Sequence, residues 1–275
     1  MRDTNFSQAE YQQFSQYLEA KCGIVLGDTK QYLVKSRLTP VIARFELNSF
    51  TALFEQLYNG VNRQLVVATI DAMTTNETFW FRDNFPFDIL AKYILPKLAK
   101  DKGNIRIWSA ACASGQEPYS IAMLVKEMQT KKLTNNANVE IVATDVSSSM
   151  LESCRLGIYD HYTLNRGLSL ARKQRFFTAI GHNSMQINDS IKQLVCFKSH
   201  NLLERSISLG KFDVIFCRNV LIYFSAEMKL KVLTDLANRL HAGGYLFLGA
   251  SESLRGLTAE FDIQRCDQGT VYQKK

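Results

Sequence analysis

The chain has 275 residues, of which 46% are hydrophobic and 21% charged, as is typical of a globular protein of one or two domains. No apolar run approaches the roughly 20 residues that span a bilayer, and the polar first twenty residues lack the apolar core of a secretion signal. We therefore expect a cytoplasmic protein that does not insert into membranes. The six cysteines and four histidines show no C-x-x-C pair and no metal-ligand spacing, which predicts reduced thiols and no metal. The net charge of +7 suits an acidic partner, either nucleic acid or an anionic protein surface.

Residues 1–72 are predicted to form a small all-helical domain. Ser7 and Glu10 match a capping box that begins a first helix, and Gly23 is a suitable end for it. Further helical patterns follow at about 29–46, 50–58 and 62–73.

The second of these helical patterns is basic, because no acidic residue lies between Asp28 and Glu46. Its cationic residues are Lys30, Lys35, Arg37 and Arg44. A solvated helix face is the common interpretation of such a pattern, and a docking surface for an acidic helix is the alternative. Pro40 is expected to kink or split this helix.

The segment TTNETFWFRD at 74–83 breaks the helical rhythm and interleaves polar residues with three aromatic ones. It is either a linker pinned to the core or a lid that stacks an aromatic ring on a base and projects Arg82 into a site. A helix over about 86–101 then leads to the first strand.

The stretch Ile105–Met123 indicates the chemistry. A short apolar strand is followed by small residues, and Gln116-Glu117-Pro118 opens a helix, with proline suitably placed in its first turn. Strand, tight turn and helix together are typical of the nucleotide cradle of doubly wound α/β folds, and an ordinary strand–helix turn is the alternative. The G-x-G-x-x-G fingerprint is absent, which argues against a nicotinamide-dependent oxidoreductase.

A second strand, Val139–Asp145, ends on a carboxylate. In nucleotide-binding sheets such a side chain accepts hydrogen bonds from ribose hydroxyls. The alternative is a helix-capping cluster with the serines at 147–149.

The region at about 158–195 interrupts the alternation of strands and helices and is predicted to be an insertion. Alternating apolar residues predict short antiparallel strands on either side of Gly181–Ser184; these residues are Met185, Ile187, Ile191, Leu194, Val195 and Phe197.

The main sheet is expected to resume with Leu194–Phe197, which leads into a loop at 199–202. Phe212–Cys217 follows, a continuous apolar run typical of a central parallel strand. A helix over about 225–241, a turn at Gly243-Gly244, a strand over Tyr245–Leu248 and a closing antiparallel hairpin around 267–269 complete the expected order.

Five motifs occur in one order: NETFWFR at 76–82, SAACASGQEPYS at 109–120, ATD at 143–145, NL at 201–202 and FCRNVLIYF at 216–224. Together they resemble the CheR-type chemotaxis receptor methyltransferases over nearly the whole chain. The resemblance implies a doubly wound, mostly parallel α/β domain at 86–275, like that of class I methyltransferases dependent on S-adenosylmethionine (SAM), with a small antiparallel β insertion. It also implies that 1–72 is a receptor-docking domain and that 73–85 is a linker or lid.

The implied activity is methyl transfer from SAM to glutamate side chains on the cytoplasmic helices of methyl-accepting chemotaxis receptors, without a metal, giving methyl esters and S-adenosylhomocysteine (SAH). The resemblance implies these cofactor contacts: Asn76, Thr78, Arg82, Glu117, Asp145, Asn201, Leu202, Arg218 and Asn219. Arg82 and Tyr223 would lie nearest the transferred methyl, and the basic helix (Lys30, Lys35, Arg37, Arg44) would meet the acidic receptor helix.

One feature departs from part of the family, because the hairpin at Gly181–Ile187 looks shorter than in members that bind a receptor tether. We predict independence of the receptor's C-terminal pentapeptide. A nucleic-acid methyltransferase is a rival interpretation, but Arg218-Asn219-Val220-Leu221 replaces the Asn-Pro-Pro-Tyr step of enzymes that methylate flipped bases. A non-catalytic SAM-binding adaptor is a further alternative that the sequence leaves open.

Overall fold

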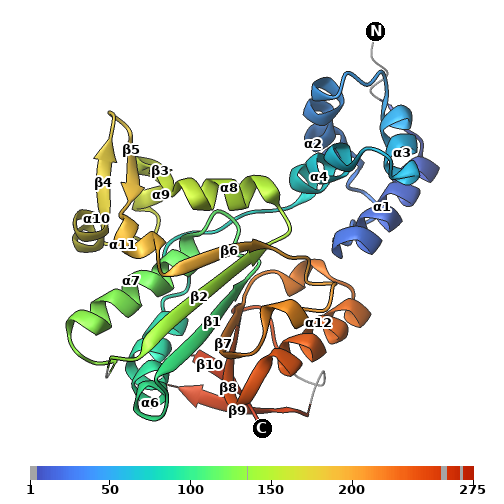
Figure 1. The fold of residues 1–275 in the computed structure, drawn as a ribbon. Coiled ribbons are helices and arrows are strands. Elements are labelled where there is room, and N and C mark those ends of the chain that lie inside the picture. Colours follow the sequence, from blue (N-terminus) through green and yellow to red (C-terminus); the bar gives the residue numbers. More distant parts are fainter. Residues whose placement is uncertain (1–4, 135, 255–258, 267–268) are drawn as a thin grey trace.

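The helical N-terminal part sits beside the carboxyl edge of a large sheet in this computed structural model, which describes residues 5–134, 136–254, 259–266 and 269–275 (Figure 1). Its helices are α1 (Gln8–Cys22), α2 (Gln31–Arg44), α3 (Phe50–Asn59) and α4 (Arg63–Met73). The predicted capping box of Ser7 and Glu10 is confirmed, and Gly23 ends α1 in the left-handed conformation. Pro40 lies inside α2, which continues past it, so the predicted split is wrong.

The four helices enclose a core of their own. Fully buried residues come from α1 (Phe14, Leu18), α2 (Leu38) and α3 (Leu53, Phe54). The aromatic rings of Phe14 and Phe54 stack at 5.0 Å between centroids. This core is separate from the two that cover the sheet.

The main sheet has seven strands in the order β6-β2-β1-β7-β8-β10-β9, and all pairs are parallel except those of β10. The strands are β1 (Asn104–Ala110), β2 (Asn138–Asp145), β6 (Val195–Ser199), β7 (Phe212–Cys217), β8 (Leu240–Leu248), β9 (Phe261–Cys266) and β10 (Gly269–Lys274). Strand order reverses between β1 and β7, which is where such folds bind ligands.

Both faces of the sheet are covered by helices, because alternate residues of each strand point to opposite faces. Ile105 and Ile107 of β1 belong to one core, with α5 (Phe85–Ile89), α6 (Leu95–Asp101) and α7 (Gln116–Thr130). Trp108 belongs to the other core, with α12 (Ala226–Arg239). The helix expected at 86–101 is continuous but contains a π-helical turn, η1 (Leu90–Ile94).

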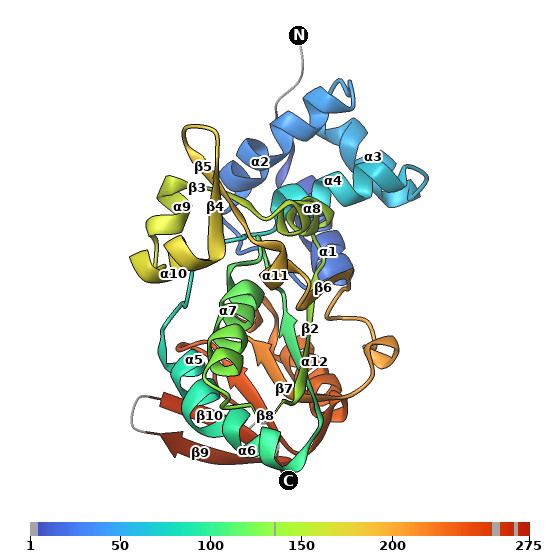
Figure 2. The same cartoon turned by 60° about the vertical axis from the view of Figure 1, so that its left-hand side comes forward.

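The insertion forms a second, antiparallel sheet in the order β3-β5-β4 (Figure 2). It follows α8 (Ser148–Leu156), which packs on the main sheet, and its elements are β3 (Ile158–Asp160), α9 (His161–Asn165), α10 (Leu170–Phe176), β4 (Phe177–Ile180), β5 (Ser184–Ile187) and α11 (Asp189–Lys192). The expected strands on either side of Gly181–Ser184 are therefore confirmed as far as Ile187.

Beyond Ile187 the antiparallel prediction is wrong, while the prediction that the main sheet resumes at Leu194–Phe197 is confirmed. Ile191 lies in α11, and Val195 and Phe197 lie in β6, which runs parallel to β2. The main-chain N–H of Ile141 in β2 donates to the carbonyl of Leu194 at 3.1 Å. The segment from Leu194 onward therefore pairs with the main sheet and not with the strands that precede it in the sequence.

The expected turn at Gly243-Gly244 is wrong as well, because β8 begins at Leu240 and runs through both glycines. The pairing of β7 with β8 shifts register between Phe212 and Val214, and a side chain at Gly244 would stand 3.0 Å from the carbonyl oxygen of Asp213. The glycines thus serve an irregularity inside the strand.

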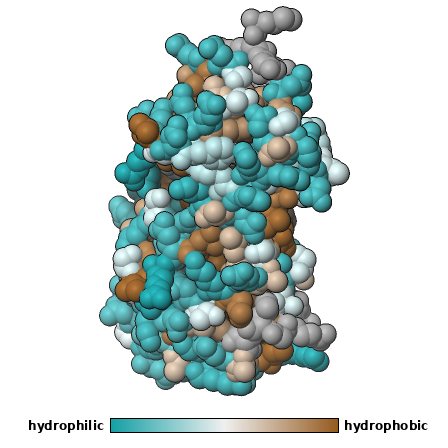
Figure 3. All heavy atoms as spheres, turned by 90° about the vertical axis from the view of Figure 1, so that its right-hand side faces the viewer, coloured by the Kyte–Doolittle hydropathy of each residue, from teal (hydrophilic) through white to brown (hydrophobic). Residues whose placement is uncertain are grey.

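The closing hairpin of β9 and β10 is confirmed, while Asp267 and Gln268 lie outside the described residues. Two 3-10 turns complete the fold, η2 (Ile207–Leu209) and η3 (Leu221–Tyr223). No helix in the described ranges is long and apolar enough to cross a membrane. On the face in Figure 3 most of the surface is hydrophilic, and apolar residues gather at mid-height, below the helical part.

Candidate functional site

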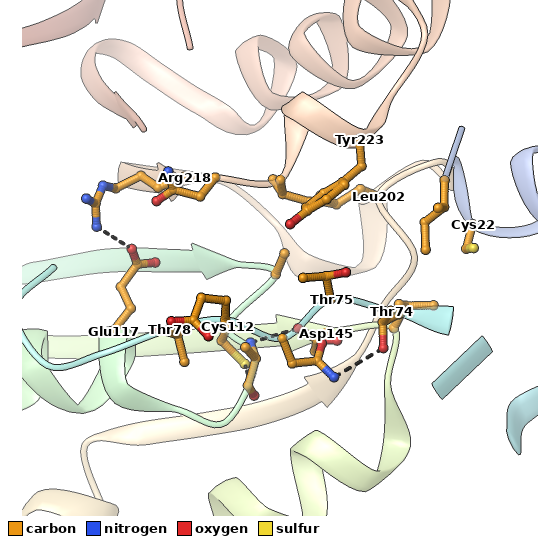
Figure 4. Close-up of a pocket in the computed structure, with 18 of the residues that line it drawn as sticks. Cys22, Thr74, Thr75, Thr78, Cys112, Glu117, Asp145, Leu202, Arg218 and Tyr223 are labelled. Carbon is orange, nitrogen blue, oxygen red and sulfur yellow. Dashed lines mark hydrogen bonds and ion pairs between the residues drawn. The ribbon is translucent and has the colours of Figure 1, made fainter. Parts of the chain in front are cut away.

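A pocket lies where the loops after β1, β2, β6 and β7 meet, and the end of α1 and the linker complete its wall (Figure 4). Parallel strands bring these loops to one edge of the sheet. Every residue that the resemblance implies for cofactor or methyl lines this pocket, namely Asn76, Thr78, Arg82, Glu117, Asp145, Asn201, Leu202, Arg218, Asn219 and Tyr223.

The turn after β1 brings bare backbone to the pocket. Ala111 and Ala113 have φ of 59° and 47°, a left-handed conformation that costs a non-glycine residue about 1–2 kcal/mol. The N–H of Cys112 donates to the carbonyl of Thr144 at 2.9 Å and fixes the turn. A hydrogen bond with Cys154 and burial raise the pKa of the Cys112 thiol, which therefore stays protonated and is no nucleophile.

Asp145 is the anchor of the opposite wall and is only 6% exposed. Its carboxylate accepts hydrogen bonds from the main-chain N–H of Ala113 at 2.8 Å and of Ser147 at 2.9 Å. Burial raises its pKa, and the backbone hydrogen bonds oppose that rise. Each oxygen retains a lone pair, so the group can accept further hydroxyl donors. Ser147 is the N-cap of α8, so the capping interpretation holds for the serine.

Glu117 and Arg218 form a pair at the start of α7. One oxygen of Glu117 accepts from the Ser109 hydroxyl at 2.7 Å, and the other meets Arg218 Nη1 at 3.0 Å (Figure 4). Arg218 Nη2 binds Asp83 at 2.6 Å and the carbonyl of Arg82 at 2.9 Å. Since the side chain of Arg218 is 1% exposed, both terminal nitrogens of its guanidinium are engaged by these protein groups and orient Glu117 and the linker, while the buried Nε has no hydrogen-bond partner in the described part of the chain.

The linker is held in an unusual backbone conformation. Phe81, Asp83 and Asn84 all have positive φ. Trp80 is fully buried, and its main-chain N–H donates to the carbonyl of Arg166 at 3.1 Å. Arg82 Nη1 donates to the carbonyl of Glu77 at 2.9 Å. The segment is therefore pinned to the core, and it also contributes to the pocket.

The helical part closes the pocket from the other side. Cys22 and Ile24 line the wall, and Asn201 Nδ2 donates to the carbonyl of Lys21 at 2.7 Å. The N–H of Val25 donates to the carbonyl of Tyr223 at 3.0 Å. The side chain of Asn201 thus joins the end of α1 to the pocket rim.

Comparison with protein families agrees with this architecture. The description "CheR methyltransferase, all-alpha domain" matches residues 9–74, and "CheR methyltransferase, SAM binding domain" matches 76–270. The chain belongs to the CheR methyltransferase family. It is therefore a SAM-dependent methyltransferase, and the family prediction from the motifs is confirmed.

Full-length relatives support the same assignment. A chemotaxis protein methyltransferase of Vibrio anguillarum is 54% identical over 275 residues, 100% of both chains. Chemotaxis protein methyltransferase 1 of Vibrio cholerae is also 54% identical over 100% of both chains, and that of Pseudomonas aeruginosa is 47% identical over 97% of this chain and 98% of its own. A role in chemotaxis follows from this set.

The basic residues of α2 occupy different environments in this CheR-family chain. Lys30 and Arg44 are exposed. Arg37 lies between them on the same side of the helix and donates to two backbone carbonyls at the start of the linker, at 2.7 and 3.0 Å. Lys35 lies about 140° around the helix axis from Lys30, and its Nζ lies over the ring of Phe6, 5.4 Å from the ring centroid. Only Lys30, Arg37 and Arg44 therefore form a line.

Several pocket residues are not among the site residues predicted from the sequence, although Glu77, Val220 and Phe224 lie inside the five motifs. They are Cys22, Ile24, Met73, Thr74, Thr75, Glu77, Val146, His200, Val220 and Phe224. His200 is bonded through Nε2 to the Ser206 hydroxyl at 2.7 Å, and burial lowers its pKa, so it is neutral at pH 7. Within the described ranges no group of His, Cys, Asp and Glu could hold a metal ion.

Proposed function

We propose that this chain transfers a methyl group from SAM to glutamate side chains on the cytoplasmic helices of chemotaxis receptors, forming γ-methyl esters. The observation that carries the proposal is that residues of all five motifs converge on one pocket, whose wall contains the carboxylates of Glu77, Glu117 and Asp145. The same pocket borders the linker that Arg37 of the basic helix holds.

The pocket suits a cationic nucleoside. Asp145 would accept the ribose hydroxyls, and Glu117 would face the charged methionine end. The backbone of Ala111–Ala113 allows close approach, since only methyl groups project from its two left-handed residues. The sulfonium supplies an electrophilic methyl group. We propose that Asn201 and Arg218 contribute by positioning the pocket wall, because their side chains are engaged within the chain.

The proposed reaction requires no proton transfer to or from a side chain of the protein. A glutamate with an ordinary pKa of about 4.3 is already ionised at neutral pH and needs no general base. The protein must instead hold the reacting atoms about 3–3.5 Å apart and exclude water. Arg82 would orient one oxygen of the incoming carboxylate, and Tyr223, which Figure 4 shows directed into the pocket, would pack against or hydrogen-bond the reacting groups.

Docking is proposed to use the line of Lys30, Arg37 and Arg44 on α2. Residues 1–72 would then form the docking domain, 73–85 the lid of the pocket and 86–275 the catalytic domain. The hairpin between β4 and β5 is short, and we propose that the receptor's C-terminal pentapeptide is not required and that nucleic acid is not a substrate. Binding of that pentapeptide at micromolar affinity in calorimetry would refute the first of these statements.

The decisive experiment is incubation with methyl-labelled SAM and receptor-rich membranes. Base-labile label on the receptor is expected, and label that is stable to base or located on nucleic acid would refute the proposal. Lys30→Glu and Arg44→Glu should raise KM for receptor while leaving SAH affinity unchanged. Lys229→Glu on α12, a half-buried lysine outside the pocket lining, serves as a charge-matched control.

A further inference from the structure

Glu252 lies outside the pocket, in the loop after β8, and its carboxylate collects backbone donors from two loops. It accepts hydrogen bonds from the N–H of Asn219 at 2.7 Å, of Gly249 at 2.7 Å and of Ile222 at 3.3 Å. Asn219 and Ile222 both belong to the segment that follows β7. A single side chain therefore joins the ends of β7 and β8.

This segment needs outside support, because its backbone is not in a favourable conformation. Asn219 has a φ of 58°, and Val220 leads directly into the 3-10 turn η3. Left-handed φ costs a residue with a side chain about 1–2 kcal/mol, less for asparagine than for most. The charge-assisted hydrogen bonds that the N–H groups of Asn219 and Ile222 donate to the Glu252 carboxylate outweigh that cost.

The two loops also touch through their backbones. A Cβ atom at Gly249 would stand 2.9 Å from the main-chain nitrogen of Asn219, and 2.6 Å from Nδ2 of the same residue. Only glycine fits there, so the loop after β8 is shaped to receive the segment that carries Asn219. This complementarity is independent of the hydrogen bonds themselves.

We infer that Glu252 is a positioning residue for methyl transfer, which holds Asn219–Tyr223 so that Asn219 and Tyr223 face the pocket. Its bond to the Ile222 N–H fixes the residue before Tyr223, while Val25 holds the Tyr223 carbonyl. The inference rests on the proposed function, since it deepens the account of the same site.

Glu252→Gln tests the inference with a side chain of the same size. Oε2 of Glu252 accepts from both Asn219 and Gly249, and the glutamine oxygen can take its place but without the charge, while the glutamine amide group would face the N–H of Ile222, a donor against a donor. Hydrogen exchange of the Asn219–Phe224 amides should accelerate in this variant while the amides of β1 keep their rates. Glu227→Gln, an exposed glutamate at the start of α12, is the control with the same change of charge and should alter neither. Unchanged exchange at Asn219–Phe224 would overturn the inference.

Steady-state kinetics distinguish a positioning role from a purely structural one. Glu252→Gln should lower kcat about 10- to 100-fold, as expected for misplaced reacting groups. If Glu252 acts through Tyr223, the double variant with Tyr223→Phe should be no slower than the slower single variant. Multiplying effects, or a kcat like that of wild type, would refute the inference. A wild-type protein that transfers no methyl would instead refute the proposed function, and the exchange result would still decide whether Glu252 holds the segment.

Discussion

Replacing Asp145 by alanine should weaken cofactor binding and also lower the stability of the fold, and the two effects can be measured separately. The carboxylate holds the N–H groups of Ala113 and Ser147, and we propose that its remaining lone pairs take the ribose hydroxyls. Asp145→Ala therefore removes two internal acceptors and two proposed contacts to the ligand at once.

The magnitudes follow from the bonds lost. A hydrogen bond to a charged group contributes about 1.5–3 kcal/mol, so two lost contacts to ribose should cost at least about 3 kcal/mol of binding free energy. Since about 1.4 kcal/mol is a factor of ten, SAH affinity should fall by at least about 100-fold. The N–H of Ala113 lies at the pocket, where water can reach it, whereas Ser147 is fully buried, so folding should lose about 3 kcal/mol.

Titration calorimetry with SAH, together with thermal unfolding, measures both effects. Ser147→Ala is the control, because it removes the hydrogen bond from the Met150 N–H at the start of α8 and leaves the carboxylate in place. That variant should lose about 1 kcal/mol of stability and keep its SAH affinity. Equal SAH affinity in wild type and Asp145→Ala would refute the role of the carboxylate, and an equal loss in Ser147→Ala would assign the effect to the loop.

Three further outcomes are expected. Gly167→Ala should lower the free energy of unfolding, measured by denaturant titration, by more than about 3 kcal/mol, because φ is +92° and the new methyl would overlap the carbonyl of Trp80. Gly181→Ala, with φ of +66° and open space around it, should lower it by about 1 kcal/mol. Arg218→Met should cost about 3 kcal/mol, the low end for a broken buried pair, since one of its carboxylate partners stays 29% exposed. The pKa of Asp145 is raised above 3.8, so lowering the pH should protonate it and weaken SAH binding earlier than for an ordinary aspartate; calorimetry from neutral to acid pH should show this loss in wild type and none in Asp145→Asn.

Local signals in the sequence were sufficient for much of the fold. The capping box at Ser7 and the glycine that ends α1 act within one turn of helix, and the continuous apolar run of β7 reflects burial on both faces. The failures have non-local causes. Ile191 has the spacing of a strand but lies in a short helix, and the strand beyond it pairs with β2, which lies far away in the sequence.

The candidate site shows the same division. The residues that the motifs predicted for the site line one pocket, because the motifs mark the carboxyl ends of parallel strands. Their individual tasks depend on partners elsewhere in the chain. Arg218 is occupied by Asp83 and Glu117, Asn201 by the end of α1, and Glu252, which no motif contains, holds the backbone of Asn219.

The main-chain hydrogen bond from Val25 to Tyr223 has a mechanical consequence. This bond directly joins the N-terminal helical bundle, which is proposed to bind the receptor, to the tyrosine that is proposed to lie beside the transferred methyl. A receptor helix that pulls on the bundle either drags this tyrosine along or breaks the bond. Chimaeras that exchange the bundle between relatives must therefore preserve this junction, or receptor recognition and turnover will be altered together.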